Sequence, residues 1–123
     1  MKLARAVCFA ALTLGFAIPA MADCAYPKTP PDPPSGSTAS KEEMIAANKA
    51  TKQYNNDVDV YLKCLDDEAL AAINALGADH KPEQEEPIKN KLDLKFDAAD
   101  KARTKYVDAM NAEIRAYHTA HPQ

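Results

Sequence analysis

The side chains best suited to chemistry in this sequence are two cysteines and two histidines, and neither pair has the spacing of a catalytic motif. Cys24 and Cys64 are 40 residues apart, unlike the C-x-x-C spacing of redox-active pairs. His118 and His121 stand three residues apart, so one helical face could present both to a metal ion. Two ligands near a chain end bind a metal weakly. We therefore predict no cofactor and no metal, with this histidine pair as a weak candidate.

Signatures of catalysis are absent from the rest of the sequence. It contains no G-x-S-x-G, no H-E-x-x-H and no glycine-rich phosphate loop. Aspartate and glutamate outnumber lysine and arginine by 18 to 15, and an acidic surface repels the phosphates of nucleic acids. We therefore predict that the protein is not an enzyme and binds no nucleic acid.

Residues 1–22 have the pattern of a cleavable signal peptide. Lys2 and Arg5 supply positive charge, an apolar run follows over 6–18, and small residues occupy the −3 and −1 positions of a cut after Ala22. The apolar run is too short to anchor the protein, and no later stretch approaches the roughly 18 apolar residues that span a bilayer. The sequence predicts a periplasmic or secreted protein without a membrane span.

Export changes the interpretation of the cysteines. Removal of the leader takes Cys8 with it and leaves only Cys24 and Cys64. An even pair in a small exported domain most often forms a disulfide, and closing a loop of this length stabilises the fold by about 4 kcal/mol in the chain-entropy model. A redox-active or metal-binding pair is the alternative.

The remaining chain, 23–123, divides into an extended segment and two helices that together form one domain. Residues 23–39 contain five closely spaced prolines, which favour a polyproline II strand. The segment 40–76 has apolar residues at steps of three and four, and it begins with the capping box Ser40/Glu43 and ends before Gly77.

A loop over 77–86 and a second amphipathic helix over 87–119 complete the domain, although proline is tolerated in a first helical turn and this helix could begin as early as Pro82. The short connection predicts an all-α fold, an antiparallel two-helix hairpin. The proline-rich segment is expected to pack along the hairpin and to be tied to it by the disulfide.

The predicted core is thin, because only 14 of the 101 residues from Asp23 onward are leucine, isoleucine, valine or phenylalanine. Alanine-rich shoulders on both helices would leave a shallow groove, and tyrosine rings beside it could receive the prolines. Arg103 interrupts the second apolar stripe, where we expect it to reach solvent or to stack on a tyrosine. Leu94 lies off the stripe, where it would be exposed. The candidate interaction surface comprises Tyr54, Tyr61, Leu94 and Arg103.

Part of the sequence resembles a family of small exported proteobacterial proteins with a Cys/Pro-rich N-terminal segment and a Tyr-x-x-Cys-Leu helix. The likeness covers residues 24–65. It implies export and pairing of the two cysteines, and it implies no activity. It rests on these positions: Cys24, Tyr26, the prolines up to Pro34, Gly36, Ala39, Glu43, Met44, Tyr54, Tyr61, Leu62, Cys64 and Leu65.

Three hypotheses about function follow. The first is a non-enzymatic interaction or structural module of the cell envelope, which binds another envelope protein or itself through apolar surface that the thin core leaves uncovered. The second is an acidic inhibitor or immunity-type protein that masks a basic site on a partner. The third is a weak metal binder that uses His118 and His121. We favour the first.

Overall fold

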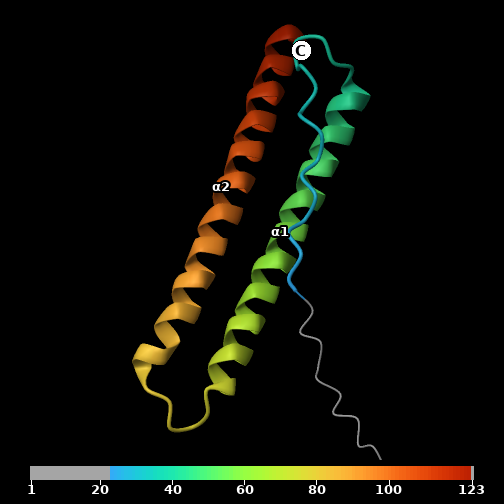
Figure 1. Ribbon diagram of the computed structural model, residues 1–123. Helices are drawn as coiled ribbons and strands as arrows, with labels where there is room; N and C mark the ends of the chain where they lie inside the picture. The colour runs from blue at the N-terminus through green and yellow to red at the C-terminus, as the bar shows by residue number, and fades with distance from the viewer. Residues whose placement is uncertain (1–22, 123) are drawn as a thin grey trace, which may run out of the picture.

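The computed structural model describes residues 23–122, which form two long helices preceded by an extended segment (Figure 1). Helix α1 spans Lys41–Ala75 and helix α2 spans Pro82–Ala120. No β-strand occurs between residues 23 and 122. The all-α prediction is therefore confirmed, whereas the predicted signal peptide, 1–22, lies outside the described residues.

Both ends of α1 are fixed by the residues that the sequence indicated. The Ser40 hydroxyl accepts the backbone N–H of Glu43 at 3.2 Å, and the Glu43 carboxylate accepts the backbone N–H of Ser40 at 2.7 Å. This capping box satisfies two backbone donors that the first helical turn leaves without partners. After the helix, Gly77 adopts a positive φ of 93°, a conformation that glycine enters without steric cost.

Helix α2 begins at Pro82, five residues before the predicted start at Pro87. Pro82 occupies the first helical position, where its missing N–H would have had no helical partner. The backbone N–H of Lys81 donates to the side-chain oxygen of Gln84 at 2.8 Å, which caps the new start. Pro87 therefore lies inside the helix, and the predicted loop over 77–86 is shorter than expected.

The two helices lie side by side, with the beginning of α1 next to the end of α2 (Figure 1). One core cluster joins Met44 of α1 to Met110 of α2, with Ala39 between them in the same cluster. A second cluster, nearer the middle of both helices, consists of Tyr54, Val58, Ala99 and Tyr106. These clusters contain nearly all of the fully buried apolar side chains of the described chain.

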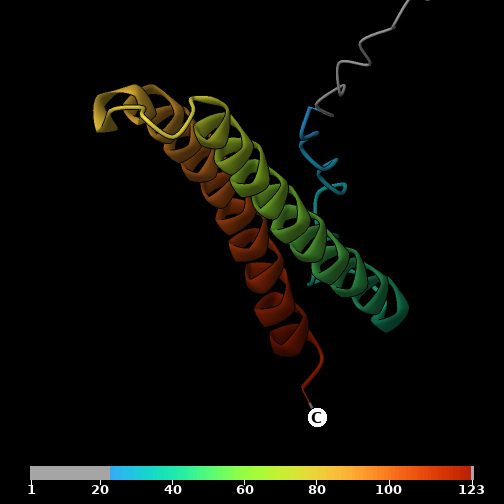
Figure 2. The same ribbon diagram turned by 90° about the horizontal axis from the view of Figure 1, so that it is seen from below.

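The extended segment lies on one face of the helix pair (Figures 1 and 2). A disulfide joins Cys24 to Cys64 in α1, as predicted. The Tyr106 hydroxyl donates to the carbonyl oxygen of Pro31 at 3.0 Å, and the N–H of Gly36 donates to the Glu113 carboxylate at 2.7 Å. The segment is therefore held at its disulfide, near its middle and at the end of α2.

Gly36 makes the closest approach between the segment and a helix. It is buried, and a Cβ atom at this position would overlap the backbone carbonyl oxygen of Glu113 and lie 2.7 Å from the backbone nitrogen of Tyr117. Only glycine leaves room for the segment to lie this close to α2.

Burial is unevenly distributed along the helix pair. All fully buried helical residues fall between Met44 and Leu65 in α1 and between Ala99 and Met110 in α2. Between residues 66 and 98, no residue is fully buried. The extended segment reaches α1 at Cys64, and none of residues 23–122 forms a third layer over the half of the helix pair nearest the connecting loop.

Candidate functional site

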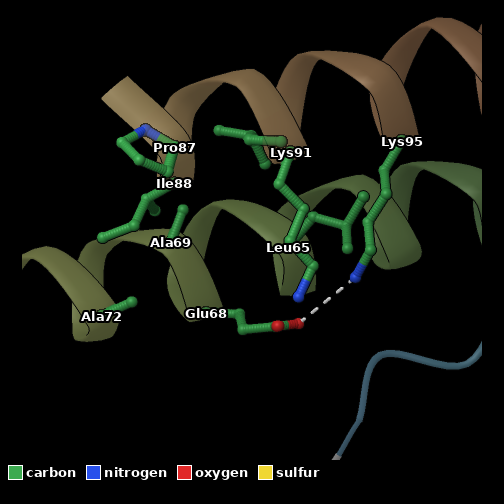
Figure 3. A pocket seen from close by; sticks show the side chains of 9 residues that line it. Leu65, Glu68, Ala69, Ala72, Pro87, Ile88, Lys91 and Lys95 are labelled. Carbon is green, nitrogen blue, oxygen red and sulfur yellow. Dashed lines mark ion pairs between the residues drawn. The ribbon is translucent and has the colours of Figure 1, made fainter. Parts of the chain in front are cut away.

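The half of the helix pair nearest the connecting loop contains an apolar hollow between α1 and α2, which we call the distal groove (Figure 3). Its volume is about 280 Å³. Figure 3 shows side chains of both helices meeting across it, with the loop end of the molecule at one side. The distal groove is lined by Leu65, Glu68, Ala69, Ala72, Pro87, Ile88, Lys91, Leu92 and Lys95.

The groove exists because small side chains occupy the α1 positions that face α2. Ala69 and Ala72 project only a methyl group toward the partner helix, so Ile88 and Leu92 remain partly exposed. A third layer would cover them, as the extended segment covers the middle of the pair. Instead, these apolar side chains form the floor of an open hollow. An exposed, concave apolar surface of this kind is typical of binding sites.

Polar atoms stand at the edge of this apolar floor. Glu68 Oε2 is buried and has no hydrogen-bond partner among the described residues. The Lys95 ammonium is the charged group that faces it, at 3.9 Å, which is longer than a hydrogen bond (Figure 3). A carboxylate oxygen in this position retains its capacity to accept a hydrogen bond.

A second hollow, the middle groove, adjoins the distal groove and shares Lys95 with it. Its volume is about 440 Å³. Tyr26 of the extended segment forms one wall, and its ring meets the Tyr61 ring edge-on with centroids 5.2 Å apart. Leu94 forms part of the α2 wall and is 72% exposed. The lining is Tyr26, Tyr61, Leu94, Lys95, Ala98, Ala99 and Ala102.

The structure thus brings together two of the four residues of the predicted interaction surface, Tyr61 and Leu94, and places Tyr54 elsewhere. Tyr54 is 2% exposed, so its prediction as a surface residue is wrong. Its ring packs edge-on against Tyr106 with centroids 5.4 Å apart, and its hydroxyl is 2.6 Å from the hydroxyl of Tyr26. The ring is core because it lies between the two helices and beneath the extended segment.

The pair of tyrosine hydroxyls has an electrostatic consequence. Partial burial, followed by the hydrogen bond to Tyr54, raises the pKa of the Tyr26 phenol to about 12. Both effects disfavour the phenolate, because it would lose water and face another electron-rich oxygen. Tyr26 is therefore a neutral hydrogen-bonding anchor of the segment and not a proton-transfer group near neutral pH.

Arg103 is held by ion pairs at the surface of the helix pair, where its side chain remains 26% exposed. Its guanidinium forms ion pairs with Asp59 of α1 at 2.7 Å and with Asp100 of α2 at 2.9 Å. The carboxylates attract the cation more strongly than a ring face would, and they hold the pKa of the guanidinium above its usual range. Arg103 is not among the residues that line either groove, and its ion pairs link the two helices; its place in the interaction surface stays a prediction.

Both C-terminal histidines contact the ring of Tyr117. The His121 ring stacks on the Tyr117 ring with centroids 4.2 Å apart, and its Nδ1 lies 3.0 Å from the Tyr117 carbonyl oxygen. The His118 ring meets the same tyrosine edge-on. Among residues 23–122, no group of three or more histidine, cysteine, aspartate or glutamate side chains is arranged to hold a metal ion.

Three apolar side chains of α1 outside the grooves are exposed because of their position around the helix. Ile45, Val60 and Leu70 lie off the apolar stripe, and each is 59% to 70% exposed. Within the described part of the chain, neither helix has a stretch that is apolar and long enough to traverse a bilayer.

No family model, curated protein or solved structure matches this chain. The resemblance to small exported proteobacterial proteins therefore stays a prediction, and the candidate site rests on the geometry of the grooves.

Sequence reasoning missed the distal groove, Glu68 and the role of Gly36. Ala69, Ala72 and Leu92 follow the helical periodicity of core residues, and periodicity alone does not show that nothing covers them. One signal was available: a disulfide at Cys64 limits the cover that the preceding segment can provide. The buried oxygen of Glu68 had no signature in the sequence.

Proposed function

We propose that this protein is a non-enzymatic interaction module of the bacterial cell envelope. Its scaffold is an antiparallel helical hairpin, with the proline-rich segment in polyproline II conformation as a third layer over half its length. The other half presents the distal groove to a protein partner. The two-helix fold and the disulfide support this scaffold.

A single observation carries the proposal. A disulfide and two hydrogen bonds to the segment backbone hold the extended segment over the inter-helix surface on one side of Cys64, whereas on the other side the described residues form an open apolar groove. Uncovered apolar surface between helices lowers stability unless a partner covers it. Docking of a partner at the distal groove would complete the layer that the segment begins.

Location in the periplasm or outside the cell is part of the proposal. The Cys24–Cys64 disulfide supports it, because such bonds persist in oxidising compartments and are rare in the cytosol. The disulfide also ties the segment to α1, so an oxidising compartment would keep the three-layer half intact and the boundary of the groove fixed.

The test is affinity capture from native envelope extract with a matched pair of variants. Ala72 lines the distal groove, whereas its neighbour Ala71 is exposed and does not. Ala72→Glu places a charge over the apolar floor, and Ala71→Glu adds the same charge outside it. We expect the wild type and Ala71→Glu to capture the same protein and Ala72→Glu to lose it.

The captures are run at low and high salt, with circular dichroism to show that both variants are folded. Apolar docking predicts recovery at both salt concentrations, because burial of apolar surface does not depend on charge screening. Recovery only at low salt would support the acidic inhibitor instead. Equal capture by the two variants would contradict a docking site at the distal groove.

A further inference from the structure

The extended segment of this chain shows how the inter-helix surface holds a peptide backbone. A helix carboxylate, that of Glu113, accepts a backbone N–H of the segment at 2.7 Å. A helix hydroxyl, that of Tyr106, donates to a backbone carbonyl at 3.0 Å. The prolines between these contacts keep the segment extended, so little conformational entropy is lost when it docks.

The distal groove continues this surface beyond the segment. Tyr26, a residue of the segment, and Lys95 of α2 both line the middle groove, and Lys95 also lines the distal groove. The two hollows therefore share a wall, and the distal groove begins next to the place where the disulfide fastens the segment to α1. An extended chain in the distal groove would extend the interface that the segment already makes.

Glu68 offers a carboxylate oxygen as Glu113 does, but the polar contact of that oxygen among the described residues is a long ion pair with Lys95 and not a hydrogen bond. Glu113 accepts a backbone N–H of the segment, whereas Glu68 Oε2 is buried and accepts no hydrogen bond from the described residues. The Glu68 side chain as a whole is 28% exposed and is ion-paired with Lys95, but Oε2 itself is shielded from solvent and accepts no hydrogen bond, which is unfavourable for an acceptor atom. A backbone N–H that enters the distal groove would provide the missing donor.

The dimensions and the charges of the distal groove restrict the kind of peptide that could bind in it. Along α1 the groove runs from Leu65 to Ala72, seven rises of the helix or about 10 Å. About three residues of polyproline II chain span that distance. Lys91 and Lys95 border the apolar floor and outnumber the one carboxylate there, that of Glu68, which is paired with Lys95; an acidic side chain beside the docked residues would therefore be attracted chiefly by Lys91.

We propose that the distal groove binds an extended, proline-containing peptide segment of a partner protein, which donates a backbone N–H to Glu68 and places an acidic side chain near Lys91 and Lys95. This inference rests on the proposed interaction function and specifies the chemistry of the partner.

The test is selection of a displayed library of random 12-residue peptides on the full oxidised protein, followed by affinity measurement of the enriched peptides. Two variants remove one carboxylate each: Glu68→Leu in the groove and Asp67→Leu on the exposed face of the same helix. We expect enriched peptides to combine proline with an acidic residue. Glu68→Leu should weaken their binding about tenfold or more, and Asp67→Leu should change it less than about twofold.

N-methylation of each peptide nitrogen that carries a hydrogen, which excludes those of proline, locates the donor. One methylated position should weaken binding to the wild type and cause no further loss with Glu68→Leu, because both changes remove the same hydrogen bond. Additive losses at every position would overturn the role of Glu68.

Two other outcomes overturn the inference and leave the interaction function standing. Enriched peptides whose binding is unchanged by Glu68→Leu and by Ala72→Glu would bind elsewhere. Failure to enrich any peptide, together with envelope capture that Ala72→Glu abolishes, would mean that the groove takes a folded surface and not an extended segment. Envelope capture that is insensitive to Ala72→Glu would instead refute the proposed function itself.

Discussion

Replacing Gly36 by alanine should detach the extended segment from the end of α2. The added methyl group would overlap the backbone carbonyl oxygen of Glu113 and lie 2.7 Å from the backbone nitrogen of Tyr117. Both obstacles are atoms of the α2 backbone, which cannot turn away as a flexible side chain can. The segment must therefore move, and the hydrogen bond from the Gly36 N–H to Glu113 is lost or lengthened.

Two contributions set the size of the effect. Forcing an extra carbon into a packed site costs about 1 to 3 kcal/mol, and losing a hydrogen bond to a charged group costs about 1.5 to 3 kcal/mol. If the segment detaches, the steric overlap is relieved but the hydrogen bond is lost, so the two costs do not add fully. We predict that Gly36→Ala lowers the free energy of unfolding by about 2 to 4 kcal/mol.

Urea denaturation of the oxidised protein, followed by far-ultraviolet circular dichroism, measures this change. Ser37→Ala is the control, since Ser37 is the exposed neighbour of Gly36 and its replacement should cost less than about 0.5 kcal/mol. Amide hydrogen exchange should also show faster exchange over residues 31–39 in Gly36→Ala. A stability equal to that of the Ser37→Ala control would refute the close packing of the segment on α2.

Three other perturbations test the remaining contacts. Serine at both disulfide positions should lower the free energy of unfolding by up to about 4 kcal/mol, the chain-entropy value for a 40-residue loop, and a loss below about 1 kcal/mol in denaturant titration would contradict the segment's tethering role. Tyr54→Phe should lower the Tyr26 pKa from about 12 toward 10, leaving it raised by burial, and an unchanged phenolate absorbance titration would contradict their hydrogen bond. At the loop end of the molecule, His80 Nε2 lies 2.6 Å from Glu85 Oε1, and this hydrogen bond is the main cause that raises the His80 pKa. Glu85→Gln should lower that pKa, which proton resonance titration would detect. The pKa of His80 in the folded protein lies above 6.5, its value in the unfolded chain. The stabilisation that His80 and Glu85 provide should therefore be complete below pH 6.5 and be lost as the pH rises through the folded pKa. An unchanged His80 pKa in Glu85→Gln would contradict the contact.

Local signals in the sequence were sufficient to place both ends of α1. The capping box of Ser40 and Glu43 and the stop at Gly77 are encoded within a few residues of the positions that they fix, and all three act as predicted. The start of α2 was ambiguous, because two prolines can each occupy a first helical turn. The structure resolves it at Pro82, where a side chain three positions into the helix, Gln84, caps the backbone.

Contacts between segments that are far apart in the sequence determine the surroundings of Gly36, Tyr54 and Arg103, and for that reason the sequence alone did not predict them. Gly36 belongs to a proline- and serine-rich stretch typical of a linker, and its need for close approach arises only from the position of α2. Tyr54 and Tyr61 share one helix and one residue type, yet the first is buried under the segment and the second borders an open groove. Arg103 pairs with Asp59, a residue 44 positions away, which no periodicity identifies.

The central claim is that a protein chain occupies the distal groove, and photo-crosslinking from the groove tests it most directly. A photoreactive phenylalanine is placed at Ala72, within the groove, and in a second protein at the exposed neighbour Ala71. Illumination of intact cell envelopes should yield a discrete crosslinked product with another polypeptide from position 72 and none from position 71. Identical products from both positions, or no product from position 72 in folded protein, would contradict the claim.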